Sequence, residues 1–248
     1  RCRSAAERRV RFAGLTMLRL LHQDEAIVAI DKPAGLLVHR TGLDAGETQF
    51  ALQMLRDQLG RPVWPAHRLD KGTSGVLLFA LGAEHARTLG QIFEATDAAH
   101  KHYVAVVRGW PPESGLIDHP LRRMEDDARV GRMEEQPAQT RFRTLERYEL
   151  PLPYGAFATT RCALLALQPL TGRRHQLRRH MKHIAHPIIG DATHGKGPLN
   201  RAIAALLGRQ RLWLHATRLE LPHPQTGLPL NIEAMPGSEW TAWHAWRA

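Results

Sequence analysis

Residues 66–80 are the stretch in which we most expect chemistry, because opposite charges come directly before an apolar run. Residues 76–80 are apolar and rich in β-formers, which predicts a buried strand, and Gly72 and Gly75 predict the turn that leads into it. Arg68 and Asp70 would then lie against a core, where a charge is costly unless it has a partner. Two interpretations are open: a structural ion pair, or a catalytic carboxylate at the mouth of a cleft.

A second, strongly cationic stretch covers residues 170–183. It predicts a helix over residues 173–184 with an apolar face made of Leu177, Met181 and Ile184. Arg174 and Arg178 would lie one turn apart on this helix, either as a solvated basic face or as ligands of an anion. Since its neighbours on the apolar side are buried, Arg178 falls at the border between core and solvent, where a guanidinium seeks a carboxylate or a phosphate. Asp70 is a candidate partner.

Four histidines in and after this stretch raise the question of a metal site: His175, His180, His183 and His186. Their spacings of five, three and three residues do not match a zinc-protease motif, and the helix offers no acidic residue. The cationic neighbours would repel a metal ion. We therefore expect no bound metal, and a metal hydrolase is disfavoured.

Composition restricts the class of protein. The 248 residues suffice for one large domain or two small ones, and no apolar run approaches the ~20 residues of a membrane span. Cys2 and Cys162 cannot form a disulfide framework, which fits a reducing cytoplasm. The formal net charge of +10 favours a polyanionic partner, with nucleic acid the default candidate.

The first sixteen residues differ from the rest of the chain, with five Arg, one Glu and no apolar period. We expect residues 1–16 to be a basic, disordered extension, and residues 17–248 to form a single domain.

Further segments predict a mixed architecture. Strands are expected at residues 18–22, 26–30, 101–107, 140–150, 158–167, 212–221 and 228–232, and helices at residues 48–59, 83–95 and 199–207. A terminal helix is expected to carry Trp240, Trp243 and Trp246 in packing contacts. Residues 111–139 are polar and predict a long surface excursion or a weak hairpin. Strands in hairpin order favour an α+β fold with a largely antiparallel sheet over a doubly wound one.

Six motifs, in order along residues 17–232, resemble the RluA-type pseudouridine synthase family. They are residues 31–39, 67–75, 101–103, 170–180, 186–191 and 214–216. The resemblance implies the pseudouridine synthase fold, a largely antiparallel mixed sheet flanked by helices around a central active-site cleft. The sequence upstream of these motifs is too short for an S4-like RNA-binding domain, so we expect a catalytic domain without one.

The implied reaction breaks the N1–C1′ bond of a uridine, turns the base and joins its C5 to C1′. This is redox-neutral, so no cofactor is expected. By resemblance, Asp70 is the catalytic carboxylate, which attacks C1′ or takes the C2′ proton, and Arg178 is the cation that keeps it ionised. Tyr103 is implied as the active-site tyrosine that holds the flipped base and helps remove the C5 proton. The remaining residues implied to contact RNA or the base are Arg68 (inserted into the stack), Leu177, His67, Arg174 and Lys71.

The short N-terminus and residues 178–180 most resemble family members that act on a tRNA uridine at the base of the T-stem. Ribosomal RNA members are the nearest alternative. A non-catalytic RNA-binding protein is a different class, disfavoured because a binder has no use for a carboxylate facing phosphate. We further expect a monomer with tRNA as partner, no membrane association and a cytoplasmic location.

Overall fold

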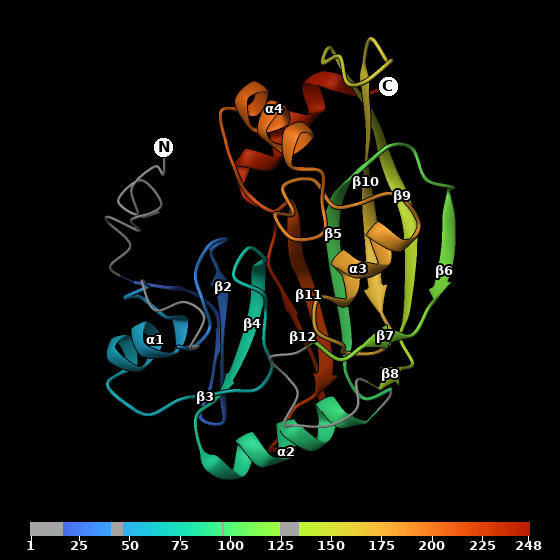
Figure 1. Cartoon of the computed structure of the whole chain (residues 1–248). Coiled ribbons are helices and arrows are strands. Elements are labelled where there is room, and N and C mark those ends of the chain that lie inside the picture. The colour runs from blue at the N-terminus through green and yellow to red at the C-terminus, as the bar shows by residue number, and fades with distance from the viewer. Residues whose placement is uncertain (1–16, 41–46, 96, 125–133) are drawn as a thin grey trace.

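The computed structural model describes residues 17–40, 47–95, 97–124 and 134–248 (Figure 1). The predicted extension at residues 1–16 lies outside the described residues. One large sheet runs through the molecule in the order β1-β2-β4-β11-β5-β10-β9-β6, with β12 paired to β11 and β3 to β4. All its pairs are antiparallel except β4 with β11. The predicted α+β fold with a largely antiparallel sheet is confirmed.

The elements of this sheet have the following bounds. They are β1 (Arg19–Gln23), β2 (Ile27–Lys32), β3 (Trp64–Pro65), β4 (Ser74–Ala80), β5 (His100–Arg108), β6 (Ser114–Asp118), β9 (Gln139–Leu150), β10 (Thr160–Pro169), β11 (Leu214–Pro222) and β12 (Pro229–Glu233). A separate two-stranded ribbon is formed by β7 (Leu121–Arg122) and β8 (Glu135–Gln136). The helices are α1 (Ala51–Leu59), α2 (Ala83–Glu94), α3 (Gln176–His183) and α4 (Gly197–Leu207), followed by a 3-10 helix (Ser238–Trp246).

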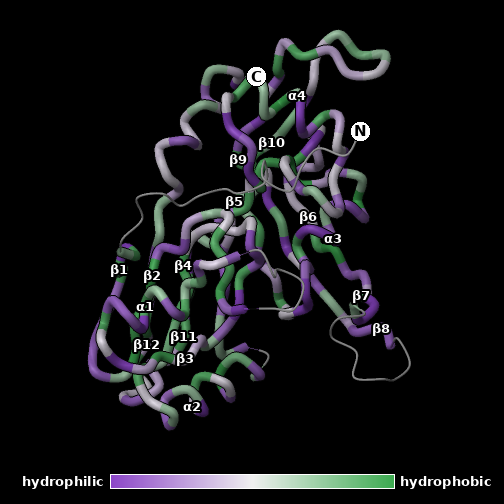
Figure 2. The backbone as a smooth tube through the Cα atoms, turned by 60° about the vertical axis from the view of Figure 1, so that its left-hand side comes forward, coloured by the Kyte–Doolittle hydropathy of each residue, from purple (hydrophilic) through white to green (hydrophobic). Residues whose placement is uncertain are grey.

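Strand alternation divides the core between the two faces of the sheet. On β4, all seven residues are buried; Leu77 and Phe79 pack towards α1, whereas Val76, Leu78 and Ala80 pack towards α2. On β5, Ala105 and Val107 pack towards α3, and Val106 packs towards α4. Hydrophobic segments, green in Figure 2, accordingly gather in the central strands.

Two helices therefore share one face of the sheet without sharing a core. The cluster under α1 and the cluster under α3 are separate, and half-buried Tyr103 on β5 packs against both. Neither helix covers the sheet at the junction between the two clusters, and a cavity lined by Tyr103 lies there.

Several expectations need correction. The predicted helix at residues 173–184 begins at Gln176, because the Gln176 side chain accepts hydrogen bonds from Thr171 Oγ1 (2.7 Å) and Arg173 N (3.0 Å) and fixes a turn there. The polar stretch at residues 111–139 contains β6, which extends the sheet by pairing with β9, as well as the expected hairpin, β7–β8. Its residues 125–133 are outside the described part.

The terminal helix has 3-10 rather than α geometry. A 3-10 helix has three residues per turn, so tryptophans at three-residue spacing share one face. Trp240 and Trp243 pack edge-on against Trp213, at centroid distances of 5.2 and 5.4 Å, which confirms their packing role.

Two glycines give a matched test of the join between β4 and β11. Gly75 has φ +106° and faces Ala216 in the register; a Cβ there would overlap the Ala216 carbonyl oxygen. Gly90 lies in α2 with open space around it. We predict that Gly75→Ala lowers the free energy of unfolding by at least ~2 kcal/mol, whereas Gly90→Ala raises it by about 0.5–1 kcal/mol.

Urea unfolding of the two variants beside the unchanged protein measures this difference. Equal stability changes in the two variants would show that the close approach of β4 to β11 is not required.

Candidate active site

The turn before β4 places Asp70 at the edge of a cavity. Thr73 N donates to Asp70 O (3.0 Å), and Gly35 N donates to Lys71 O (2.7 Å), so the turn is tied both to itself and to residues that follow β2. Leu69 is buried in the cluster under α1, whereas the Asp70 side chain keeps 26% of its surface exposed. Asp70 is thus a fixed carboxylate that a ligand can reach.

Lys32 is hydrogen-bonded to the same turn through its side chain. Its side chain is fully buried, and Nζ donates to Leu36 O (2.8 Å), Pro33 O (2.9 Å) and Lys71 O (3.3 Å). Burial lowers the pKa of Lys32 to about 7, against the attraction of Asp70. Lys32 lies in the motif at residues 31–39, but a lysine in a turn is ordinarily solvated, so its residue type did not indicate this role.

Arg178 on α3 joins two carboxylates. Its Nη1 donates to Asp70 Oδ2 (3.0 Å), and its Nε and Nη2 donate to the two oxygens of Asp191, both at 2.8 Å. Burial works against the charge, but Asp191 and Asp70 together raise the pKa of the guanidinium. The predicted Asp70–Arg178 ion pair is present, and Arg68 and Asp70 form no ion pair with each other in the described part of the chain.

Asp191 is a site residue that sequence reasoning did not identify. It follows β10 and α3 in a loop, its side chain is fully buried, and its Oδ1 accepts the backbone N–H groups of Thr193 and His194, both at 2.9 Å. Burial opposes ionisation, yet the bonds from Arg178 and from these N–H groups outweigh it and lower the pKa of Asp191. Asp191 therefore stays charged, and its two hydrogen bonds with Arg178 fix the orientation of the guanidinium.

His175 stands beside the same carboxylate in an unusual backbone conformation. It has φ +53°, which is uncommon for a residue with a Cβ, and its Nε2 lies 3.8 Å from Asp70 Oδ1. Its Nδ1 lies 3.1 Å from His194 Nε2. Burial lowers the pKa of His175, so a neutral imidazole is favoured next to Asp70. Strain of this kind is common at functional sites.

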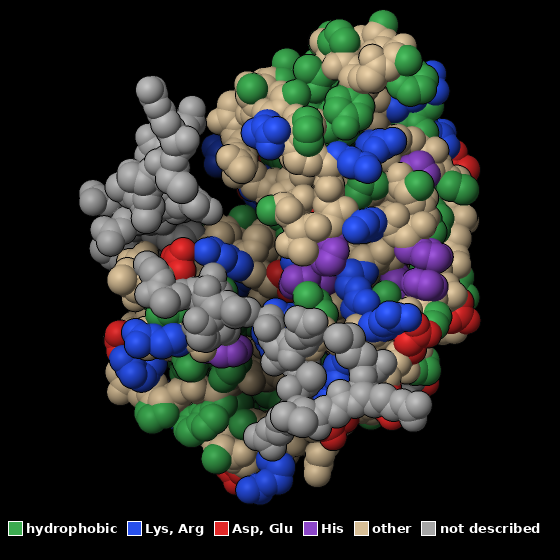
Figure 3. Space-filling model, viewed as in Figure 1, with side chains coloured by type: hydrophobic (Ala, Val, Ile, Leu, Met, Phe, Trp, Pro, Cys, Tyr) green, Lys and Arg blue, Asp and Glu red, His purple; other side chains and the backbone are tan. Residues whose placement is uncertain are grey.

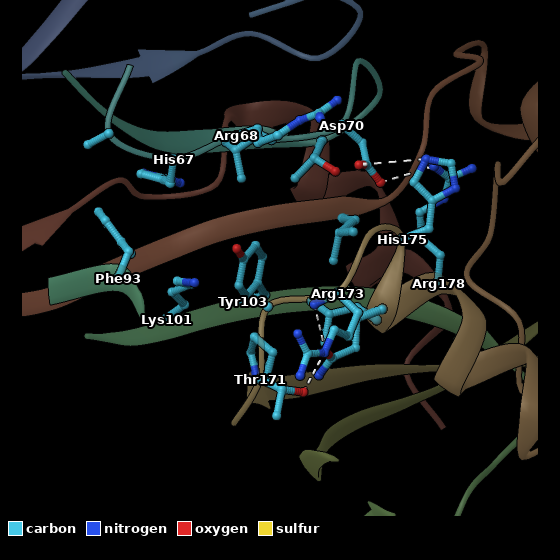
Figure 4. Close-up of a pocket in the computed structure, with 18 residues that line it drawn as sticks. His67, Arg68, Asp70, Phe93, Lys101, Tyr103, Thr171, Arg173, His175 and Arg178 are labelled. Atoms are coloured by element: carbon cyan, nitrogen blue, oxygen red, sulfur yellow. Dashed lines mark hydrogen bonds and ion pairs between the residues drawn. The ribbon is translucent and has the colours of Figure 1, made fainter. Parts of the chain in front are cut away.

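The cavity at Asp70 holds about 290 Å³, near the small end of the roughly 300–1,000 Å³ of ligand sites. Figure 4 shows Tyr103 between Asp70 on one side and Lys101 and Phe93 on the other. Burial, and secondarily Asp70, raise the pKa of the Tyr103 phenol, which is therefore neutral. The predicted residues that line this cavity are His67, Arg68, Asp70, Tyr103, Leu177 and Arg178.

His67 and Lys71 are placed differently from the other predicted residues. His67 Nε2 accepts the backbone N–H of Leu78 (3.2 Å), and burial lowers the pKa of His67 to about 3. It presents a neutral ring at the wall, not a charge for phosphate. Lys71 is outside the lining, and its Nζ pairs with Glu47 Oε1 at 2.8 Å.

A second cavity of about 450 Å³ adjoins the first and shares Arg68, Asp70, Gly172, Arg173 and His175 with it. Arginines dominate its wall: Arg68, Arg122, Arg123, Arg173, Arg174 and Arg179. Asp70 is the one acidic residue among the described lining residues. Figure 3 shows cationic and histidine side chains gathered over the middle of this face.

Metal-binding clusters and membrane-spanning helices are both absent from the described residues. No three or more His, Cys, Asp or Glu side chains are grouped there so that they could hold a metal ion. Nor does the described part contain a helix of the length and apolarity that crossing a membrane requires.

Comparison with known proteins gives consistent matches. A family model described as RNA pseudouridylate synthase matches residues 26–183. A protein of Vibrio cholerae named tRNA pseudouridine synthase C is 48% identical over 228 residues, covering 90% of this chain and 93% of that protein. A Salmonella typhimurium protein of the same name is 47% identical, covering 90% of this chain and 87% of that protein. Human RNA Pseudouridylate Synthase Domain Containing 4 has a similar structure, with a TM-score of 0.67, 27% identity and 92% of each chain covered.

Proposed function

Because this chain belongs to the RNA pseudouridylate synthase family, we propose that it isomerises a uridine of tRNA to pseudouridine. One observation of the site carries the proposal: a reachable carboxylate, Asp70, stands at a nucleoside-sized cavity and is held by a buried guanidinium. The names of its relatives support tRNA as the class of substrate.

Asp70 supplies the anion that the reaction requires. Cleavage of the N1–C1′ bond leaves positive character at C1′, which a carboxylate stabilises by direct attack or after taking the C2′ proton. Both routes need the ionised form. Arg178 Nη1 donates to Asp70 Oδ2, and the remaining exposed surface leaves Asp70 accessible to the sugar.

The target base must leave the RNA stack to reach this cavity. Arg68 extends from the segment before β4 at the shared wall of the two cavities, where it can fill the gap left in the stack. Tyr103 offers the flipped base an aromatic face, and Leu177 packs beside it. Since the Tyr103 phenol is neutral, it acts in the C5 deprotonation by hydrogen bonding and proton relay, not as a resident phenolate.

The arginine-lined cavity is suited to the RNA backbone. Several guanidinium groups around one cavity repel each other unless an anion lies between them, and a phosphodiester is the anion that this substrate carries. Because the two cavities share a wall, a uridine in the first brings its flanking phosphates to the second. Arg174, predicted to contact RNA, lines this second cavity.

The position that we propose for the target is the base of the T-stem, on the strength of the resemblance within the family. Ribosomal RNA is the alternative substrate.

Replacing the carboxylate tests the reaction. We predict that Asp70→Asn retains tRNA affinity within about threefold and lowers turnover by at least ~10⁴-fold, because the amide cannot stabilise C1′ or accept the C2′ proton. Carbodiimide mapping of pseudouridine in tRNA transcripts measures turnover, and filter binding measures affinity. Asp57→Asn, on exposed α1 surface, is the matched control and should leave both unchanged.

Turnover of Asp70→Asn near that of the unchanged protein would remove Asp70 from the mechanism. Pseudouridine formed in ribosomal RNA fragments, with tRNA unmodified, would overturn the substrate and keep the reaction.

Salt dependence tests the arginine-lined cavity. We predict that Arg123→Gln reduces the slope of log affinity against log salt by about one, as expected for one lost phosphate contact. Arg143→Gln is the matched control, because Arg143 alternates with buried Phe142 on β9 and so faces away from α3. An equal slope for Arg123→Gln and Arg143→Gln would place the RNA backbone elsewhere.

A further inference from the structure

Lys101 lies in the cavity on the opposite side of Tyr103 from Asp70 (Figure 4). Lys101 and Tyr103 are two positions apart on β5, so their side chains leave the same face of the strand. Asp70, Tyr103 and Lys101 thus follow one another along a single cavity.

The ammonium of Lys101 has no hydrogen-bond or ion-pair partner in the part of the chain that the structure describes. Nζ lies over the Phe93 ring, 5.1 Å from its centroid, and beside Gly172. Burial lowers the pKa of Lys101, which reflects the cost of this environment for a charge. An ammonium has three donors, and leaving them unmet in a half-buried position is costly. The position is therefore suited to an acceptor brought by a ligand.

Other polar groups at this end of the cavity are already occupied. His67 Nε2 accepts the Leu78 N–H, and Thr171 Oγ1 donates to Gln176 Oε1. Arg173 Nε donates to Pro137 O (3.1 Å). Of these four lining side chains in the described part of the chain, Lys101 is the one that makes no hydrogen bond.

The shape of uridine fixes which atoms reach Lys101. When the base lies on Tyr103 and C1′ lies at Asp70, N1 of the base is directed towards Asp70. C4, which carries the oxygen O4, is on the opposite side of the ring from N1. Acceptor O4 therefore points to the far end of the cavity, where the Lys101 ammonium stands.

We propose that Lys101 contacts the substrate and stabilises the negative charge of the departing uracil, an inference that rests on the proposed isomerisation. When N1–C1′ breaks, its electron pair stays on N1 and spreads over O2 and O4, while C1′ becomes electron-deficient and is met by Asp70. No proton leaves Lys101; its charge balances the uracil anion. Preorganised donors of this kind typically contribute ~10²–10³ to rate.

The turn of the base keeps this contact. Rotation by half a turn about the axis through N3 and C6 exchanges N1 with C5 and O4 with O2. One ammonium can therefore bind O4 before the rotation and O2 after it, so C5 arrives at C1′ with the charge still compensated.

The same contact selects uracil over cytosine. Cytosine carries an amino group at C4 in place of O4, and that donor would face the donor of Lys101. A site whose buried donor is left unpaired rejects the wrong substrate strongly.

Removing the charge tests the proposal. We expect Lys101→Met to lower the single-turnover rate on uridine-containing tRNA by about 10²-fold, with tRNA affinity within about threefold, since methionine fills the apolar space beside Phe93. Lys101→Arg, which keeps the charge, should recover most of the rate. Lys196→Met, on an exposed lysine before α4, is the matched control and should leave the rate unchanged.

A leaving-group comparison separates this role from a structural one. Fluorine at C5 stabilises the uracil anion, so N1–C1′ cleavage of a 5-fluorouridine target should lose less rate in Lys101→Met than cleavage of uridine does. An equal loss for both targets, or a rate within threefold of the unchanged protein, would overturn the proposal. If Lys101→Met does not fold, Lys101→Gln provides the same comparison. An unchanged protein inactive on tRNA would instead count against the proposed function.

Discussion

A single guanidinium shared by two carboxylates is the interaction on which this site depends. Arg178 gives two of its bonds to Asp191, which is fully buried, and one to Asp70, which a ligand can reach. Burying the Arg178–Asp191 ion pair costs free energy unless the polar atoms of both side chains have hydrogen-bond partners. The backbone N–H groups of Thr193 and His194 provide further partners for Asp191. The arrangement orients Asp70 without enclosing it.

The fold supplies this arrangement by leaving a gap between two cores on one face of the sheet. The turn before β4 brings Asp70 from the side of α1, while Arg178 comes from α3, and β5 runs beneath the gap with Tyr103 on its exposed face. Because β4 is buried on both faces, the turn that carries Asp70 cannot shift without disturbing the centre of the molecule. The position of the proposed catalytic carboxylate therefore depends on the packing of the core.

The sequence was sufficient for the parts that depend on local pattern. The apolar run at residues 76–80 predicted β4, the helical period around Leu177 predicted most of α3, and the motifs placed Asp70, Tyr103 and Arg178 in one site. It could not supply what depends on long-range contacts. From the sequence, Asp191 is an ordinary loop aspartate, and only the structure shows its buried side chain bound to Arg178. Lys101 is likewise predicted to be a solvated strand lysine, whereas the structure places it in the wall of the cavity. The left-handed His175 likewise has no signal in its residue type.

We expect Asp191 to serve the reaction by holding Arg178 against Asp70, and a double-mutant cycle tests this role. Single-turnover pseudouridine formation would be measured for Arg178→Met, for Asp191→Asn and for the two changes combined, with thermal unfolding confirming that each protein is folded. If the two residues act as one unit, the double variant will be no slower than Arg178→Met alone. Losses that multiply would show that Asp191 acts independently of Arg178 and does not serve the reaction by holding the guanidinium.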